Sequence, residues 1–274
     1  MTKSRAFLKW AGGKFKLVDQ IAARLPRSER LVEPFVGAGS VFLNTDYAEY
    51  LLSDINPDLI GLYQTLQQRP DDYIATARKL FVPVNNDKET YYGMRAEFNQ
   101  THDQFGRAVL FLYLNRHGYN GLCRYNKSGG FNVPFGSYKK PYFPEKEMWF
   151  FAEKAQRATF FCEGYGDAFA RARHGDAVYC DPPYLPLSTT ANFTSYASGG
   201  FSLDDQALLA DCAVAAANKQ AATVLISNHD TPLARKLYHA ASLDTLKVTR
   251  SISQTASGRK KVDELFALYR PERD

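Results

Sequence analysis

Short apolar runs that end in polar or glycine residues recur in both the first and the last part of the chain. They occupy residues 30–39, 50–56, 158–167, 177–184 and 223–230. Continuous apolar runs of this length are typical of strands that are buried on both faces of a parallel sheet. Residues 203–219 are rich in Ala and Leu and carry Asp204 and Asp205 in their first turn, which predicts a helix. The pattern therefore predicts an α/β fold.

The end of the chain has a different pattern. Residues 243–253 and 263–270 flank a polar loop at residues 254–261, which predicts a β-hairpin and an antiparallel edge to the sheet. Arg259, Lys260 and Lys261 lie at the tip of that hairpin. They are either phosphate ligands or solvated surface charges, and the sequence does not decide between the two.

The middle of the chain, residues 57–144, predicts a second domain inserted into the first. Asn56 followed by Pro57 is typical of a helix cap and first turn, and helices are expected over 89–100 and 105–117. The glycine-rich aromatic stretch 117–144 predicts a loop and hairpin. We therefore expect a catalytic domain formed by 1–56 and 145–274 and an inserted, mainly helical domain formed by 57–144.

Composition narrows the class of protein. A chain of 274 residues that is 45% hydrophobic can bury a substantial core. Its longest apolar run, residues 108–114, is too short to span a membrane, so we expect a soluble, cytoplasmic monomer. The four cysteines form no C-x-x-C pair and the histidines lack ligand spacing, so we expect buried cysteines and no metal site.

The positive charge gathers in one part of the chain. The formal net charge is +5, and residues 104–144 hold six Lys or Arg, no Asp or Glu, and ten Phe or Tyr. Cations beside aromatic rings suit a surface that binds phosphates and stacks on bases. Residues 119–140 are the expected surface, with Arg124 as the base reader because its fork grips two acceptors of guanine. Arg107 and Arg116 are expected to contact phosphate or nothing.

A glycine-rich loop follows the first predicted strand. In the motif VEPFVGAGS, residues 32–40, Gly37 and Gly39 allow a tight turn and close approach of a ligand. Phe42 stands where a dinucleotide fingerprint has its third glycine, which argues against an oxidoreductase. Asp54 is either a ligand of ribose hydroxyls or the cap of a helix. Together these features favour S-adenosylmethionine, with Trp10 in the segment FLKWAGGK as part of a lid.

A second motif follows another predicted strand. The run AVYC is succeeded by DPPY, residues 181–184. Two prolines stop sheet pairing and stiffen the chain, so a carboxylate, a carbonyl and an aromatic ring are displayed at the end of a strand. Alone, DPPY is more typical of an ordinary proline-rich turn, so its context must decide.

Six motifs, in the order FLKWAGGK, EPFVGAGSVFLN, DIN, RHGYNGLCRYN, FNVPFG and DPPY, resemble those of the Dam-type DNA adenine-N6 methyltransferases. The resemblance covers residues 5–269. It implies a Rossmann-like class I methyltransferase sheet with an inserted target-recognition domain. It also implies transfer of a methyl group from S-adenosylmethionine to adenine N6 within GATC in double-stranded DNA.

The resemblance also assigns roles to residues. The residues expected at the cofactor are Trp10, Lys14, Phe35, Gly37, Gly39, Asp54 and Asp181. Those expected to be catalytic are Asp181, Pro182 and Tyr184. Those expected to contact DNA are Lys9, Tyr119, Asn120, Leu122, Arg124, Pro134 and Tyr138. Ser137 and residues 127–130 depart from the family pattern, which affects phosphate contacts and not the reaction.

The DPPY motif has a chemical interpretation in this family. The lone pair of adenine N6 is delocalised into the ring, and two acceptors on its N–H groups, Asp181 and Pro182, would free that lone pair. Tyr184 would stack on the base, which must first be flipped out of the duplex. Two alternatives remain: the same chemistry on RNA or another flat amine, and a catalytically silent DNA-binding protein.

Overall fold

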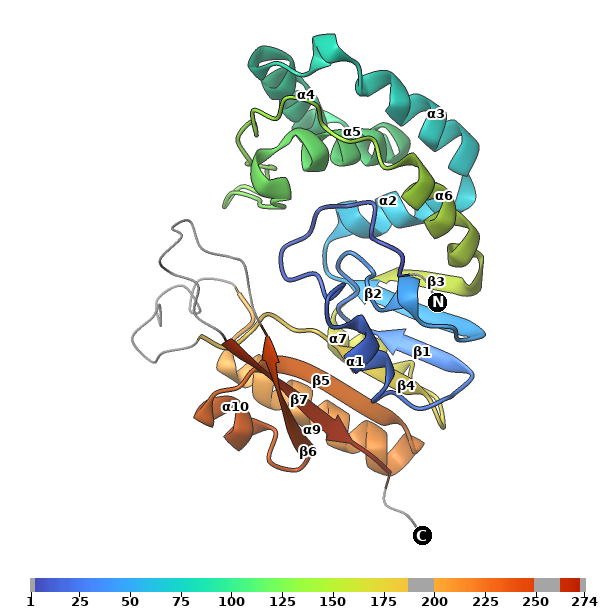
Figure 1. The fold of residues 1–274 in the computed structure, drawn as a ribbon, viewed down its shortest axis with the longest axis vertical. Helices are drawn as coiled ribbons and strands as arrows, with labels where there is room; N and C mark the ends of the chain where they lie inside the picture. The colour runs from blue at the N-terminus through green and yellow to red at the C-terminus, as the bar shows by residue number, and fades with distance from the viewer. Residues whose placement is uncertain (1–2, 187–199, 249–261, 272–274) are drawn as a thin grey trace. The chain divides into compact units, whose positions relative to one another are not determined.

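A computed structural model describes residues 3–186, 200–248 and 262–271 (Figure 1). The chain consists of two compact units, each of which makes most of its contacts within itself. Unit 1 comprises Met1–Asp19, Val36–Asp46 and Leu52–Cys162, and unit 2 comprises Gln20–Phe35, Tyr47–Leu51 and Glu163–Asp274. All of residues 57–144 belong to unit 1. The functional domain boundaries given above remain a prediction.

The described strands form one seven-stranded sheet in the order β3-β2-β1-β4-β5-β7-β6 (Figure 1). β1 pairs with β4, and β4 with β5, in parallel, whereas β7 is antiparallel to both β5 and β6. The predicted α/β fold is confirmed. The strands are β1 (Arg30–Glu33), β2 (Glu49–Asp54), β3 (Ala158–Cys162), β4 (Ala177–Cys180), β5 (Thr223–His229), β6 (Ser242–Val248) and β7 (Val262–Tyr269).

The C-terminal hairpin is confirmed, with one difference in its placement. Its second strand, β7, lies between β5 and β6, so the antiparallel strand is one position inside the edge. β7 is buried from Glu264 to Tyr269, whereas β6 is largely exposed. The more apolar strand therefore takes the inner position. Arg259, Lys260 and Lys261 lie outside the described residues.

The central strands are held by burial and by one ion pair within unit 2. Every residue of β1 and β4 is buried, as expected for parallel strands covered on both faces. Arg30, the first residue of β1, binds Asp176, the residue before β4, with Nη2 2.6 Å from Oδ2. The pair fixes the two strands at their amino ends, so that both reach the opposite edge of the sheet in register.

Helices occupy both units (Figure 1). In unit 1, α5 packs against α2, α3 and α4, and its residues from Ala108 to His117 are all buried, as in a helix enclosed by its neighbours. In unit 2, α9 packs on β5 and β7. The helices are α1 (Val18–Ala22), α2 (Pro57–Gln68), α3 (Pro70–Leu80), α4 (Lys88–Gln100), α5 (Gln104–His117), α6 (Glu145–Lys154), α7 (Tyr165–Ala170), α9 (Leu203–Gln220) and α10 (Pro232–Leu237).

The buried His117 at the end of α5 gives the fold a pH dependence. Burial, opposed by its contact with the Tyr113 carbonyl, lowers the pKa of His117 to about 4. The unfolded chain, with an ordinary pKa near 6.5, binds more protons between these values, so stability falls as the pH falls. Going from pH 7 to 4, we expect this group to lower the unfolding free energy by about 3 kcal/mol. Urea unfolding of His117→Gln should show a weaker pH dependence than that of exposed His102→Gln. An equal pH dependence of the unfolding free energy in the two variants would contradict this role of His117.

Other predictions from composition have mixed outcomes. All four cysteines are free, but only Cys180 is buried and Cys162 is exposed, so the expectation of buried cysteines was wrong for the latter. Cys162 is the last residue of β3 and lies on the same side as the buried Ala158 and Phe160, so its exposure reflects its position at the end of the strand. Within the described residues, no helix is both long and apolar enough to cross a membrane. The same residues contain no cluster of three potential metal ligands.

Candidate functional site

The glycine loop and Asp54 meet in unit 1. The backbone N–H of Gly37 donates to Asp54 Oδ2 at 3.1 Å, and that of Asn56 donates to Oδ1 at 3.0 Å. Asn56, and not Asp54, caps α2 by accepting from the N–H groups of Asp58 and Leu59. Burial raises the pKa of Asp54, and the two N–H donors oppose that effect. Asp54 is therefore a half-buried carboxylate at the carboxyl end of β2, beside a glycine turn and not part of a helix cap.

Trp10 covers the glycine loop. Gly37 has φ +46°, and a Cβ atom built on it would lie 3.0 Å from Trp10 Nε1. Gly39 has φ +70°. The indole therefore lies directly against the turn whose Gly37 N–H binds the Asp54 carboxylate. Lys14 is buried and donates to the Gly12 carbonyl at 2.9 Å. Phe35 belongs to unit 2, where its ring stacks on Tyr165 and meets Phe201 edge to face.

The DPPY motif is anchored within unit 2 by a serine to which the sequence analysis gave no role. Ser227 on β5 donates from Oγ to Asp181 Oδ1 at 3.2 Å. The hydroxyl of Tyr179 lies 2.9 Å from the same Oγ. Because β4 and β5 are parallel neighbours, the end of β5 brings Ser227 beside the residue that follows β4. The position of Ser227 at the end of a predicted strand was the available signal.

Tyr184 is fixed at its hydroxyl end. The hydroxyl donates to the fully buried Glu264 and lies 3.1 Å from Ser227 Oγ. Its ring meets His229 edge to face. Burial above all, with the neighbouring carboxylates, raises the pKa of Tyr184, so the phenol stays protonated. Two polar residues on neighbouring strands, Ser227 on β5 and Glu264 on β7, thus bind the Tyr184 hydroxyl and fix the motif.

The two proline carbonyls of the motif differ in their surroundings. Gln206 Nε2, on α9, donates to the Pro183 carbonyl at 2.7 Å. Among the described residues, none donates to the Pro182 carbonyl. Asp181 and Pro182 therefore present a carboxylate and a backbone acceptor next to each other at the end of a rigid strand.

The residues predicted to contact DNA lie together in unit 1. Tyr119, Asn120, Arg124 and Pro134 are exposed, and Leu122 and Tyr138 are half-buried. The Tyr119 N–H donates to the Pro134 carbonyl at 2.8 Å, and the Asn120 N–H donates to the Tyr138 hydroxyl at 2.9 Å.

Lys9 joins this group from a distant part of the sequence. Its Nζ lies 3.8 Å from the centroid of the Tyr138 ring. Asn115 on α5 holds the Lys9 backbone, accepting from its N–H at 2.9 Å and donating to its carbonyl at 2.8 Å. Burial first, and the charge of Arg116 second, lower the pKa of Lys9. An ammonium that is partly desolvated in this way is suited to an anionic or electron-rich partner.

Arg107 and Arg116, two arginines in the positively charged part of the sequence, bind other residues of the protein. Arg107 binds the buried Asp58, with Nε 2.5 Å from Oδ1. Arg116 is buried and donates to the Tyr142 carbonyl at 3.0 Å. The expectation that these arginines contact phosphate or nothing did not anticipate these partners, because Asp58 lies 49 residues before Arg107.

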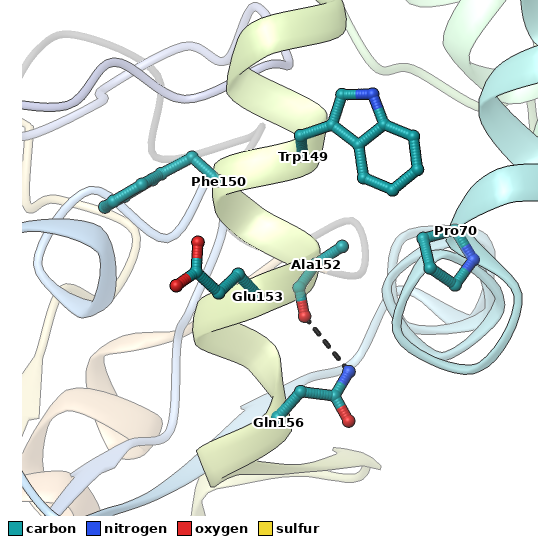
Figure 2. A pocket seen from close by; sticks show the side chains of 6 residues that line it. All are labelled: Pro70, Trp149, Phe150, Ala152, Glu153 and Gln156. Atoms are coloured by element: carbon teal, nitrogen blue, oxygen red, sulfur yellow. Dashed lines mark hydrogen bonds between the residues drawn. The ribbon is translucent and has the colours of Figure 1, made fainter.

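A depression elsewhere in unit 1 is separate from all predicted site residues. Pro70 and five residues at the end of α6 and just after it line it, and Gln156 donates to the Ala152 carbonyl there (Figure 2). Trp149 and Phe150 are exposed at its rim. It holds no group suited to methyl transfer.

Comparison with known proteins identifies the family. Residues 10–252 match the model of the D12 class N6 adenine-specific DNA methyltransferases. A DNA adenine methylase of Vibrio cholerae serotype O1 is 63% identical over 99% of this chain and 98% of the relative. The DNA adenine methylase of Escherichia coli strain K12 is 61% identical over 99% of this chain and 97% of the relative. The one of Serratia marcescens is 57% identical over 98% of this chain and 100% of the relative. The strand order and the antiparallel β7 agree with the predicted class I methyltransferase sheet. The chain therefore belongs to the D12 class of N6 adenine-specific DNA methyltransferases.

Proposed function

We propose that the reaction of this family is carried out here with S-adenosylmethionine as methyl donor and adenine within GATC in double-stranded DNA as acceptor. The observation that carries the proposal is the pair of acceptors at the end of β4, where Ser227 holds Asp181 and the Pro182 carbonyl has no described donor. Six ordered motifs that resemble the Dam-type enzymes support the choice of GATC.

The cofactor is proposed to bind beside the glycine loop of unit 1. Asp54 would accept from ribose hydroxyls, and Trp10 would cover the ligand above Gly37. The remaining expected contacts come from Lys14, Phe35, Gly39 and Asp181. When bound, S-adenosylmethionine supplies a methyl group on a sulfonium, which is electrophilic without further activation.

The catalytic residues are proposed to act on the amino group of a flipped adenine. Asp181 and the Pro182 carbonyl would accept from its two N–H groups and favour the geometry in which the nitrogen lone pair can attack. Their fixed positions lower the cost of orienting the base, because neither needs to move during the reaction. Tyr184 would stack on the base, its ring held in place by the contacts of its hydroxyl.

Sequence recognition is proposed to come from the exposed group of unit 1. Arg124 would grip guanine, and Lys9, Tyr119, Asn120, Leu122, Pro134 and Tyr138 would line the DNA around it. These residues belong to the proposed recognition domain, 57–144, except Lys9, which belongs to the proposed catalytic domain of 1–56 and 145–274. A monomer in the cytoplasm, associated with the nucleoid through DNA, is the proposed working form.

The proposal is tested with methyl-labelled S-adenosylmethionine and two duplexes that differ only in whether GATC is intact or scrambled. We expect label on adenine N6 of the intact duplex alone. Label on both duplexes would support the proposed methyl transfer and would overturn the proposed preference for GATC. Label on neither would overturn the proposal and favour an RNA substrate, tested next, or a silent DNA-binding protein.

A further inference from the structure

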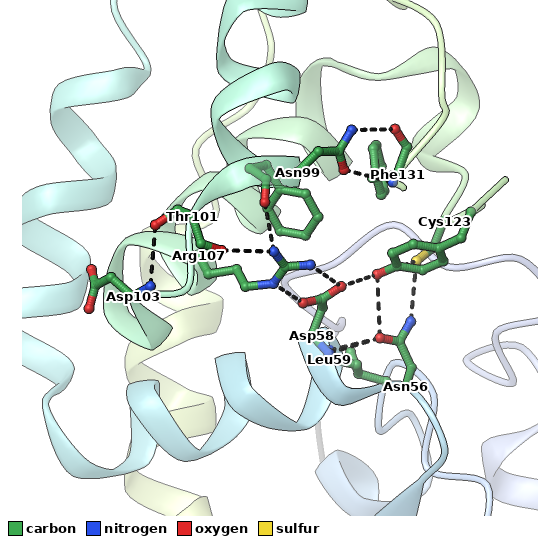
Figure 3. Close-up of polar contacts among 11 residues, drawn as sticks. Asn56, Asp58, Leu59, Asn99, Thr101, Asp103, Arg107, Cys123 and Phe131 are labelled. Carbon is green, nitrogen blue, oxygen red and sulfur yellow. Dashed lines mark hydrogen bonds and ion pairs between the residues drawn. The ribbon is translucent and has the colours of Figure 1, made fainter. Parts of the chain in front are cut away.

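A buried network of polar side chains joins the start of α2 to a short hairpin in unit 1 (Figure 3). This hairpin carries Arg124 and is closed by the bridge between Tyr125 and Phe131. The centre of the network is Asp58, the second residue of α2, whose two carboxylate oxygens face Arg107 Nε and Nη2 at 2.5 and 3.3 Å. Arg107 also donates from Nη1 to the carbonyls of Phe98 and Thr101 at 2.7 and 3.1 Å. The carboxylate is thus held from the side of the helices.

The hairpin contacts this network through two side chains. The Tyr125 hydroxyl donates to Asp58 Oδ2 at 2.5 Å and lies 3.5 Å from Asn56 Oδ1. Asn56 Nδ2 lies 3.4 Å from Cys123 Sγ. Burial above all raises the pKa of Tyr125, so its hydroxyl remains a donor.

Alternation along the hairpin explains why Arg124 faces the other way. Successive side chains of an extended segment point to opposite sides. Cys123 and Tyr125 are partly buried toward α2, and Arg124 between them is exposed. The hairpin itself is closed by the bridge between Tyr125 and Phe131 and by the Asn132 N–H, which donates to the Arg124 carbonyl at 2.8 Å.

The described contacts of the Arg124 guanidinium lie within the hairpin. Its Nε and Nη2 both donate to the Asn132 carbonyl, at 3.1 and 2.7 Å. They fix the guanidinium relative to the hairpin but not the hairpin relative to the rest of unit 1. A bidentate contact with a base depends on orientation as much as on charge. Tyr125 lies next to Arg124 and contacts the start of α2, whereas Asn99 on α4 binds the backbone of Phe131 in the opposite arm of the hairpin.

We propose that Tyr125 is a positioning residue for base recognition, which uses its bond to Asp58 to set the direction of Arg124. The proposal rests on the proposed role of Arg124 in reading guanine. Asp54 is held by the backbone N–H groups of Gly37 and Asn56, whereas the Tyr125 hydroxyl contacts the Asn56 side chain only at 3.5 Å. The cofactor site should therefore be unaffected when that hydroxyl is removed.

The test is Tyr125→Phe, which removes the hydroxyl and keeps the ring that packs against Phe131. Methylation rates are measured on a GATC duplex and on one whose guanine is replaced, and the ratio of kcat/KM is the readout. We expect the preference for GATC to fall about tenfold. The dissociation constant of S-adenosylmethionine should stay within about twofold of the wild-type value.

Tyr73→Phe is the matched control. Tyr73 in α3 is fully buried and donates to the Ala108 carbonyl at 3.1 Å, so its variant also loses a buried tyrosine hydrogen bond in unit 1. A general loss of stability would change both variants alike, whereas positioning predicts a changed preference in Tyr125→Phe alone. An equal loss of preference in the two variants would overturn the proposal.

Arg124→Ala separates failure of this proposal from failure of the recognition assignment. Arg124→Ala should lower the preference, and adding Tyr125→Phe should lower it little further, because both act through one contact. If Arg124→Ala lowers the preference and Tyr125→Phe does not, the positioning role is wrong and the base-reading role stands. If Arg124→Ala leaves the preference unchanged, both are wrong.

Discussion

Replacing Asp181 with alanine is expected to lower kcat about a thousandfold while DNA affinity stays within about twofold. The change removes one of the two acceptors for the adenine amino group, and preorganised contacts of this kind contribute two to three orders of magnitude to rate. It also breaks the bond with Ser227 that fixes the motif. Incorporation of labelled methyl groups in single-turnover reactions, and DNA binding by fluorescence anisotropy, measure the two quantities separately.

A graded series makes the Asp181 result specific. Ser227→Ala leaves the carboxylate but removes its donor, so an intermediate loss of about tenfold is expected. Asp204→Ala changes an exposed carboxylate in the first turn of α9 and should leave the rate unchanged. Appreciable turnover by Asp181→Ala would contradict the catalytic assignment. Equal losses in all three variants would point to a general loss of stability and not to a catalytic role of Asp181.

The fold was predictable where the information is local. Apolar runs that are buried on both faces identified the strands, and Asn56 with Pro57 identified the start of α2, because the side chain and the fixed φ of proline act on adjacent residues. The position of β7 between β5 and β6 was not predictable in this way. It depends on which of two hairpin strands buries more apolar surface against β5, which is a comparison between distant segments.

The prediction of the candidate site from the sequence has the same limit. Gly37, Asp54 and the DPPY motif stand at the ends of predicted strands, where α/β proteins place their ligands, so the sequence pattern was sufficient to propose them as site residues. Ser227 and Tyr125 act through hydrogen bonds to residues that are 46 and 67 positions away. Arg107 was misjudged for the same reason, since its partner Asp58 is equally remote. Side chains that position a site through contacts distant in sequence are identified from the folded structure and not from a sequence motif.

Replacing Gly37 with alanine is expected to weaken S-adenosylmethionine binding about tenfold. The new methyl group would lie 3.0 Å from Trp10 Nε1, so the indole must shift by a few tenths of an ångström from the loop that it covers. A ring that covers a ligand contributes about 1–3 kcal/mol, and a shifted ring loses part of that contribution. A loss of about 1.4 kcal/mol corresponds to tenfold in affinity. The φ of +46° adds about 1–2 kcal/mol of strain for a residue with a side chain, which lowers stability whether or not the ligand is bound.

Gly175→Ala separates strain from displacement of the indole. Gly175 also has a positive φ, +78°, but a Cβ atom there meets nothing within 4 Å. Both variants should lose stability to urea, and only Gly37→Ala should lose affinity. The chain has two tryptophans, so Trp149→Phe leaves Trp10 as the single reporter, and its fluorescence during titration with S-adenosylmethionine gives the dissociation constant. Wild-type affinity in Gly37→Ala would mean that the ligand does not lie against this loop, because any ligand there would meet the displaced indole.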